Sequence, residues 1–375
     1  MPTIALDATP LLGQRTGIGV AVAGFVRHLA GTPGLDLLGY GLTARGWHRL
    51  AALLPPEIRP VRRPAPAGLL LEAWSRGEWP PVEIWTGRVD LVHGTNFVVP
   101  PSRSAGRLVS VWDLTAVHHP QLCTAESLRY PRLVSRALER GAWVHTGSHS
   151  VAAEIIDHFG VDAGRVRVVP PGVDRAISPV ATDPPPAGGS LPAGGARPYL
   201  LALGRTEPRK DLPTLIRSFD LVAESHPDLE LRIAGPAGWA EDEVRREIGR
   251  ARFGSRVHRM GWVDDARGLL AGAAVFAYPS VYEGFGLPPR EAMALGVPVV
   301  ATAVGAIPEV AGGASELVQP GDATAMAEAI TAILDDSGRR AELVRQGFER
   351  VDRYSWAAAT EGLLRVYREM LGRPL

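Results

Sequence analysis

Two carboxylates bracket a glycine- and proline-rich loop in the second half of the chain. Glu283 precedes the loop and Glu291 follows it, with seven residues between them. The apolar run 275–278 predicts a buried strand before the loop, residues 291–296 predict a short helix, and the run 297–302 predicts a second buried strand. A strand, a glycine loop and a helix N-terminus together place backbone N–H groups beside an anionic ligand. The stretch therefore predicts a site for a phosphate-bearing ligand.

Each residue of this loop has a possible role in binding a ligand and a possible role that is only structural. Glu291, near the start of the predicted helix, could accept two hydroxyl hydrogen bonds, as a ribose offers, or it could simply offset the helix macrodipole. Glu283 follows Tyr282 in a loop where no helix gains from its charge. Gly284 and Gly286 lack a Cβ, so their amides can approach phosphate or sugar hydroxyls closely. An ordinary tight turn is the alternative.

A second candidate site holds two cations. Lys210 is the only lysine of the chain, in which arginine supplies every other basic side chain. Arg205 stands where a predicted strand ends, and Lys210 follows five residues later at the entrance of a predicted helix. Two cations at such a point suit a diphosphate, because charge-assisted hydrogen bonds are strong. The alternative is a solvated loop in which Arg209 and Lys210 flank Asp211.

Composition limits the class of protein. A chain of 375 residues favours two domains, and its zero net charge gives no indication of a nucleic-acid partner. Cys123 is the only cysteine, which excludes a disulfide framework and a cysteine metal cluster. The N-terminus lacks a signal-peptide pattern, and no apolar run approaches the roughly 20 residues of a membrane span. We expect a cytoplasmic protein, with a peripheral position at the inner membrane face as the alternative.

Short apolar runs alternate with amphipathic stretches in both halves, which predicts an α/β fold built on parallel sheets. The first strand is predicted at Thr3–Leu6, and later apolar runs of the first half end in polar side chains. Ligands of open parallel sheets bind beyond the carboxyl ends of the strands. These polar side chains include His93, Thr95, Asn96, Asp113, His145 and Ser148.

A run of Pro, Gly, Ala and Ser at 175–197 predicts a linker between two domains. We therefore expect two Rossmann-like domains, at 1–174 and 198–354, facing each other across a cleft. A C-terminal helix at about 355–375 is a candidate to pack back onto the first domain.

Four segments of the chain carry a family resemblance. GRTEPRKD, followed by PSVYEGFGLPPREAMALGVPVVA, resembles the retaining glycosyltransferases of the GT4 type, which have the GT-B fold. The spacing of Glu283 and Glu291 matches that family's signature, and the match spans roughly 199–321. In the first half, DATPLLGQRTGIG and VWDLTAVHHP resemble a mannosyltransferase-rich branch of the family.

The resemblance implies roles for individual residues. Arg205 and Lys210 would hold the donor diphosphate. Glu291 would bind the ribose, and Glu283 would lie near the anomeric carbon of the donor sugar. The other implied donor contacts are a glycine loop in the first half (Gly17, Ile18, Gly19), the main chain of Val263 and the backbone of Gly284, Phe285, Gly286 and Leu287.

The first half departs from the family pattern at one point. The family often has a histidine close to the transferred sugar where this chain has Trp112. The next residue, Asp113, is the best candidate for a catalytic residue on the acceptor side. The alternative is that its carboxylate only caps the following turn.

Other chemistries receive less support. The dinucleotide fingerprint G-x-G-x-x-G would need a glycine at position 22 after Gly17 and Gly19, but the next glycine is Gly24. A redox enzyme with a Rossmann fold is therefore disfavoured. The chain contains no Asp-x-Asp, so a metal-dependent GT-A enzyme is disfavoured, and we expect neither a metal nor another cofactor. Arginines at helical spacing within 129–140 could contact anionic lipid, but a charged helix face in water is the more common explanation, so membrane contact is not favoured.

The sequence thus predicts a retaining, metal-independent transferase that uses a nucleotide-sugar donor and a glycan or glycoconjugate acceptor. Mannose from GDP-mannose is the favoured donor by resemblance, and UDP-glucose is the alternative. A UDP-sugar epimerase on the same fold is a rival enzyme class. A sugar-nucleotide sensor or an inactive partner subunit is the rival without catalysis. The sequence does not indicate the acceptor or the oligomeric state.

Overall fold

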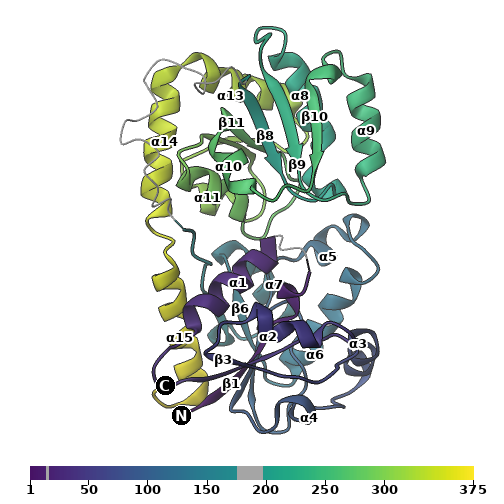
Figure 1. Cartoon of the computed structure of the whole chain (residues 1–375), viewed down its shortest axis with the longest axis vertical. Coiled ribbons are helices and arrows are strands. Elements are labelled where there is room, and N and C mark those ends of the chain that lie inside the picture. Colours follow the sequence, from purple (N-terminus) through teal and green to yellow (C-terminus); the bar gives the residue numbers. More distant parts are fainter. Residues whose placement is uncertain (14–16, 175–196) are drawn as a thin grey trace. The chain divides into compact units, whose positions relative to one another are not determined.

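Each half of the chain builds one parallel sheet in the computed structural model, which describes residues 1–13, 17–174 and 197–375 (Figure 1). The chain divides into unit 1, formed by Met1–Gly172 with Tyr354–Leu375, and unit 2, formed by Val173–Arg353. The predicted fold class, α/β with two Rossmann-like sheets, is confirmed. The predicted linker lies outside the described residues except for Arg197.

Unit 1 contains a seven-stranded parallel sheet in the order β3-β2-β1-β4-β5-β6-β7. Its strands are β1 (Thr3–Asp7), β2 (Asp36–Tyr40), β3 (Ile58–Pro60), β4 (Leu91–Gly94), β5 (Gly106–Ser110), β6 (Trp143–Thr146) and β7 (Val166–Val168). Its helices are α1 (Gly17–Leu29), α2 (Leu50–Leu53), α3 (Ala67–Arg76), α4 (Glu83–Thr86), α5 (Thr115–His118), α6 (Tyr130–Glu139), α7 (His149–Phe159) and α15 (Trp356–Leu371).

Unit 2 contains a six-stranded parallel sheet in the order β10-β9-β8-β11-β12-β13. Its strands are β8 (Tyr199–Leu203), β9 (Glu230–Ala234), β10 (Val257–Gly261), β11 (Val275–Tyr278), β12 (Val299–Thr302) and β13 (Glu316–Val318). Its helices are α8 (Leu212–Val222), α9 (Glu241–Arg250), α10 (Ala266–Ala271), α11 (Leu287–Ala294), α12 (Ile307–Ala311), α13 (Ala323–Asp335) and α14 (Ser337–Val351). The order of strands reverses between β8 and β11, so the loops after these two strands meet at the switch point where such sheets bind ligands.

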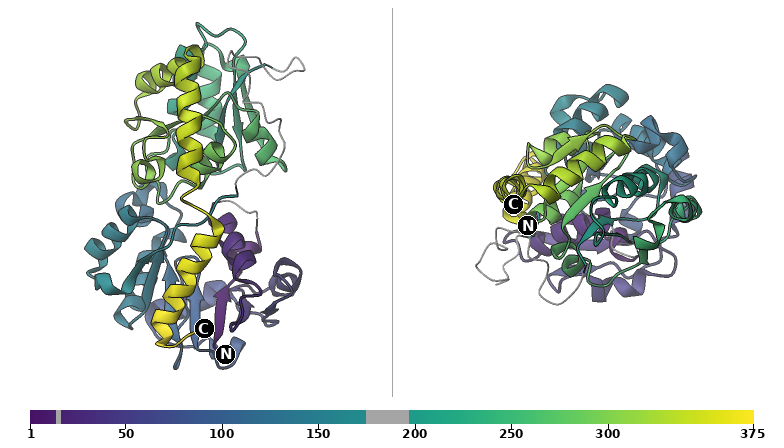
Figure 2. Two further views of the ribbon diagram at one scale, coloured as in Figure 1. Left: turned by 90° about the vertical axis from the view of Figure 1, so that its left-hand side faces the viewer. Right: turned by 90° about the horizontal axis from the view of Figure 1, so that it is seen from above.

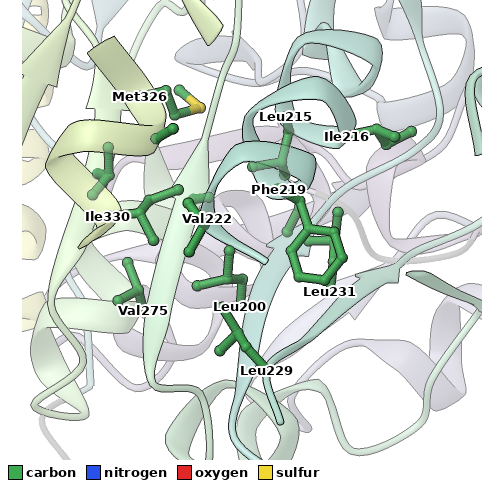
Figure 3. Close-up of a cluster of buried hydrophobic side chains, with 14 of the residues drawn as sticks. Leu200, Leu215, Ile216, Phe219, Val222, Leu229, Leu231, Val275, Met326 and Ile330 are labelled. Atoms are coloured by element: carbon green, nitrogen blue, oxygen red, sulfur yellow. The ribbon is translucent and has the colours of Figure 1, made fainter. Parts of the chain in front are cut away.

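The central strands of unit 2 are apolar up to their last residues, Tyr278 of β11 and Thr302 of β12, because helices cover both faces of the sheet. All four residues of β11 are buried, and so are all four of β12. Figure 3 shows part of the core on one face, where Leu215 and Phe219 of α8 and Met326 and Ile330 of α13 pack over Leu200. This packing fixes the strand ends from which the functional loops leave.

Three predicted boundaries change for local reasons. Helix α11 begins at Leu287, four residues before the predicted start, because Pro288 and Pro289 occupy its first turn, where a missing N–H costs nothing. Strand β12 begins at Val299 rather than at residue 297. The predicted glycine loop of the first half is partly helical, since Gly17 is the first residue of α1, and residues 14–16 lie outside the described residues.

The last helix of the chain belongs to unit 1, where α15 runs alongside α1 (Figure 2). Trp356 at its start stacks on His28, with ring centroids 5.1 Å apart, and meets Phe25 edge to face. Glycines make room for this indole: a Cβ on Gly24 would lie 1.9 Å from the ring of Trp356. Near the end of α15, Glu369 pairs with Arg167 at 2.7 Å.

We predict that Gly24→Ala lowers the free energy of unfolding by about 1–3 kcal/mol, because the added methyl overpacks a ring that already has aromatic neighbours. Differential scanning calorimetry measures the effect as a lower Tm. Gly68→Ala is the matched control: this helical glycine of α3 has open space around its Cβ position. The control should leave Tm unchanged or raise it slightly. Equal Tm values for both variants and the unmodified protein would contradict the packing argument.

Candidate active site

The loop after β8 holds the lone lysine against the edge of the sheet in unit 2. A short 3₁₀ turn, Pro208–Lys210, leads into Asp211, whose φ is +39° and whose carboxylate accepts a hydrogen bond from the Thr214 amide at the start of α8. Lys210 is folded back over the strand end, since its Cε lies 3.4 Å from the position of a Cβ on Gly204. The alternative of a solvated lysine is therefore wrong.

Neighbouring strands support this loop. The Thr206 hydroxyl donates to Glu241 Oε2 at 2.7 Å and accepts from the Gly238 amide at 2.7 Å. Arg259, on β10, donates to the same carboxylate oxygen at 3.0 Å. The loop is thus attached to the segment after β9 and, through Glu241, to β10, which fixes the position of Arg205 next to Thr206.

The loop after β11 fixes the backbone of Glu283. The carbonyl of Glu283 accepts a hydrogen bond of 2.8 Å from the Ala306 amide. Gly305 has a φ of +49°, and a Cβ there would lie 2.2 Å from the Glu283 carbonyl oxygen, so only glycine fits. The side chain of Glu283 is also buried, with a relative exposure of 6% for the residue.

The two loops meet in a buried cluster of charges. Lys210 Nζ lies 2.5 Å from Glu283 Oε1, and Arg209 Nη1 lies 2.7 Å from the same oxygen. Lys210 also donates to the Tyr278 hydroxyl at 2.8 Å, and Arg209 donates to the Tyr282 carbonyl at 2.9 Å. A single carboxylate oxygen therefore joins the loop after β8 to the loop after β11.

Electrostatics keep Glu283 ionised although it is buried. Burial alone would raise the pKa of Glu283, but the charges of Arg209 and Lys210 outweigh that effect and lower it to about 2. Burial lowers the pKa of Lys210, an effect that the charge of Glu283 opposes. At neutral pH the site holds a desolvated carboxylate fixed by cations.

Arg205 and Lys210 line one pocket at the ends of β8 and β11, together with Gly204 and Tyr278. Arg205 is more exposed than Lys210 and donates to the Ala237 carbonyl at 3.3 Å. The structure thus brings together three of the residues predicted from sequence: Arg205, Lys210 and Glu283.

The glycine turn before α11 is tightly enclosed. Gly286 has a φ of +78°, and a Cβ there would lie 2.6 Å from Ile307 Cδ1. Phe285 lies under the guanidinium of the fully buried Arg290, 3.9 Å from ring centroid to Cζ. Leu287 is the first residue of α11.

Glu291 is the fifth residue of α11, so the alternative that it offsets the macrodipole from the first turn is wrong. It makes no hydrogen bond or ion pair with any other residue in the described parts of the chain. Burial raises its pKa, and the charges of Arg290 and Arg267 oppose the rise. A half-buried carboxylate with no direct partner is suited to accept hydrogen bonds from a ligand.

The remaining predicted residues stand on other elements. Val263 follows β10 and packs against the core beside the exposed Trp262. In unit 1, Gly17, Ile18 and Gly19 form the first turn of α1. Asp113 accepts a 2.9 Å hydrogen bond from the Thr115 amide, so it forms the turn that starts α5. The capping role is therefore observed, and the acceptor-side role stays a prediction.

Two histidines expected at the ligand-binding edge of unit 1 are internal instead. His145 Nε2 donates to the Val169 carbonyl at 2.9 Å, so its Nδ1 must accept the Ser110 hydroxyl proton at 2.8 Å. Ser110 then accepts from His93 Nε2, and His93 Nδ1 accepts from the Tyr367 hydroxyl of α15, each at 2.8 Å. Each donor in this series of hydrogen bonds has one acceptor. The series connects α15 to β4, β5 and β6.

Sequence reasoning missed Arg209 and Tyr278. Arg209 entered the sequence analysis only in the alternative of a solvated loop around Asp211, yet it contacts the same oxygen of Glu283 as Lys210. Its only sequence signal was its position in the pair Arg209–Lys210. Tyr278, the sole polar side chain of β11, stands at the strand end that faces the cluster.

Comparisons with known proteins identify the family. Residues 16–176 match the family model described as Glycosyltransferase Family 4, and residues 197–336 match the one described as Glycosyl transferases group 1. O-antigen chain mannosyltransferase B of Escherichia coli is 30% identical over 285 residues, covering 74% of this chain and 74% of that protein. The chain therefore belongs to the family 4 glycosyltransferases, a retaining group.

Two further proteins are similar to this chain. Phosphatidyl-myo-inositol mannosyltransferase of Mycolicibacterium smegmatis is 36% identical over 179 residues, covering 46% of this chain and 45% of that protein. The structure of sucrose-phosphate synthase from Thermosynechococcus elongatus aligns with a TM-score of 0.75 at 21% identity, covering 99% of this chain and 100% of that one. This likeness establishes the GT-B fold. Within the described residues, no helix combines the length and apolarity needed to cross a bilayer.

We predict that the stability supplied by His145 depends on pH. Burial lowers its pKa to about 4 from an ordinary value of 6.5, so the unfolded chain binds the proton more tightly. This stability is complete above pH 6.5 and is lost as the pH falls toward 4; at pH 5 the loss is about 2 kcal/mol. In urea unfolding, the penalty of His145→Gln should be smaller at pH 5.0 than at pH 7.5. An equal penalty at both values contradicts a buried neutral imidazole.

Proposed function

We propose that the protein transfers a mannosyl residue from GDP-mannose to a hydroxyl group of a glycan or glycoconjugate, with retention of configuration. The observation that carries the proposal is the cluster of Arg205, Lys210 and Glu283 at the switch point of unit 2. Similarity to two named mannosyltransferases supports the choice of mannose.

The donor diphosphate binds Arg205 and Lys210. Both side chains line the pocket at the ends of β8 and β11, and both carry the charge that a diphosphate requires. Lys210 presents a compact ammonium with three donors, which contacts Tyr278 and Glu283 and can turn to a phosphate oxygen.

The rest of the donor extends along the same edge of the sheet. Glu291 accepts the two ribose hydroxyls, the main chain of Val263 contacts the base, and Glu283 faces the sugar near its anomeric carbon. The backbone of Gly284, Phe285, Gly286 and Leu287 contacts sugar hydroxyls and phosphate. From unit 1, Gly17, Ile18 and Gly19 supply amides of the first turn of α1, whose N–H groups have no partners inside the helix. Asp113 acts on the acceptor side.

Transfer proceeds on one face of the sugar. The bond between the anomeric carbon and the diphosphate oxygen breaks, and its electron pair goes to the diphosphate, where Arg205 and Lys210 stabilise the charge. The acceptor hydroxyl oxygen bonds to the anomeric carbon from the same side, and its proton passes to the departing phosphate oxygen. The products are GDP and the mannosylated acceptor. The scheme requires neither a metal ion nor a protein base.

Glu283 acts electrostatically in this scheme rather than as a covalent nucleophile. Its oxygen Oε1 is held by two cations, and its pKa of about 2 makes it a weak nucleophile. A fixed carboxylate near the anomeric carbon instead stabilises the positive charge that develops on the sugar as the bond breaks.

We predict that Lys210→Ala and Glu283→Ala each lower kcat of transfer by about 10²–10³, the usual effect of removing one group that stabilises transition-state charge. Glu342→Ala is the control, because this glutamate pairs with Arg345 on the surface of α14. Initial rates with an accepted donor and acceptor provide the measurement, and circular dichroism verifies the fold. Full rates in both variants would refute the site.

We predict that GDP-mannose raises Tm more than UDP-glucose or an ADP-sugar in a thermal-shift screen, because a ligand that binds only the native state stabilises it. A preference for a UDP-sugar contradicts the mannosyl assignment and favours the glucosyltransferase alternative. Product analysis with the donor alone separates transfer from epimerisation. Donor binding without hydrolysis or transfer across an acceptor panel supports a sensor or an inactive subunit.

A further inference from the structure

We infer that Arg209 is a positioning residue that keeps Glu283 neutralised while Lys210 turns its charge toward the donor diphosphate. The inference rests on the proposed function and assigns different tasks to the two neighbouring cations. Arg209 is the permanent partner of Glu283, and Lys210 is the exchangeable one.

The first argument is that both cations contact the same atom. Arg209 Nη1 and Lys210 Nζ lie 2.7 Å and 2.5 Å from Glu283 Oε1. Removing every cation from a buried carboxylate is costly, because the remaining charge lacks both water and a partner. With two cations on one oxygen, either can leave without exposing the carboxylate to that cost.

The second argument is that Arg209 is bound to the Glu283 loop through side chain and backbone. Its guanidinium donates to the Tyr282 carbonyl at 2.9 Å, and its own carbonyl accepts from the Val281 amide at 2.8 Å. A planar guanidinium can hold a carbonyl and a carboxylate together. Arg209 therefore stays with Glu283 whenever the loop after β11 moves.

Lys210 has the opposite character. Its other direct partner is the hydroxyl of Tyr278, a neutral acceptor, and its side chain lines the pocket that it shares with Arg205. Burial and the charge of Glu283 both raise the pKa of the Tyr278 phenol well above its usual range, so it remains a neutral partner. A flexible four-carbon stem lets the ammonium turn to a phosphate oxygen without losing the tyrosine.

The charge balance of the cluster supports this division. Arg205, Arg209 and Lys210 face two carboxylates, Glu207 and Glu283, and the contacts from Glu207 to Arg205 and to Arg209 are both longer, at 3.8 Å. One positive charge is therefore in excess before the donor binds. An incoming diphosphate takes up that excess, and Arg209 is the group that allows Lys210 to supply it.

The test is a double-mutant cycle on nucleoside diphosphate affinity, measured by titration calorimetry. The probe is whichever of GDP, UDP and ADP binds the unmodified protein most tightly, so a wrong donor base refutes only the GDP part of the proposed function. In Arg209→Met, Glu283 retains Lys210, and affinity should fall about 10- to 100-fold, the range of one charge-assisted hydrogen bond. In Arg209→Met/Glu283→Gln the carboxylate charge is absent, Lys210 is released, and affinity should return to within about threefold of the unmodified protein.

Two further variants complete the cycle. Glu283→Gln alone should bind the diphosphate at least as tightly as the unmodified protein while losing transfer activity. Arg217→Met is the matched control, because Arg217 pairs with Glu247 on the outside of the same unit at 3.1 Å, and it should bind normally. If Arg209→Met cannot be purified, Arg209→Gln, which also removes the charge, carries the same expectations.

Two outcomes overturn the inference. Normal affinity in Arg209→Met shows that Lys210 does not depend on Arg209. Affinity that stays low in the double variant shows that Arg209 acts through something other than the charge of Glu283, such as the shape of the loop. A role limited to folding cannot produce rescue by a second substitution at the carboxylate.

Discussion

One buried carboxylate oxygen determines the geometry of the candidate site. Glu283 Oε1 receives an arginine from the loop after β8 and the only lysine of the chain, and the loop after β11 is fixed from behind by Gly305. A desolvated carboxylate is stable only with cations in contact, and desolvated cations need the carboxylate in return. The ion pairs therefore couple the two loops, and the pocket beside Arg205 is lined by residues at the ends of both strands.

The parallel sheet explains why the charges meet at this point. The strand order reverses between β8 and β11, so their carboxyl ends are neighbours and their loops leave in the same direction. The strands beneath are apolar except at their carboxyl ends, where Tyr278 of β11 accepts a hydrogen bond from Lys210. In unit 1 the equivalent interior polar groups are arranged differently, since His93, Ser110 and His145 satisfy one another and α15. In unit 2 the charged groups of the site lie at the carboxyl edge of the sheet. In unit 1 the histidines lie inside the core and bind its strands to α15.

The sequence allowed prediction of the fold class, of β11 and of the two loops, because apolar runs and glycine spacing are local properties. It did not allow prediction of the contact between Arg209 and Glu283. Lys210, the residue after Arg209, lies 73 residues before Glu283 in the chain, and only the order of the strands brings the two loops together. His93 and His145 looked like edge residues for the same reason: a strand shows where its polar end lies, but not whether neighbouring strands supply a partner. The two prolines of α11 were misleading because proline breaks a helix interior but fits its first turn.

The return of α15 to unit 1 has a consequence for synthesis on the ribosome. Unit 2 is one continuous stretch, Val173–Arg353, so all of its strands are translated before α15. Unit 1 needs Trp356 to fill the space beside Gly24 and Tyr367 to complete the hydrogen bonds of His93. Unit 1 therefore begins to be translated before unit 2 but completes its core only after unit 2, once α15 has been synthesised.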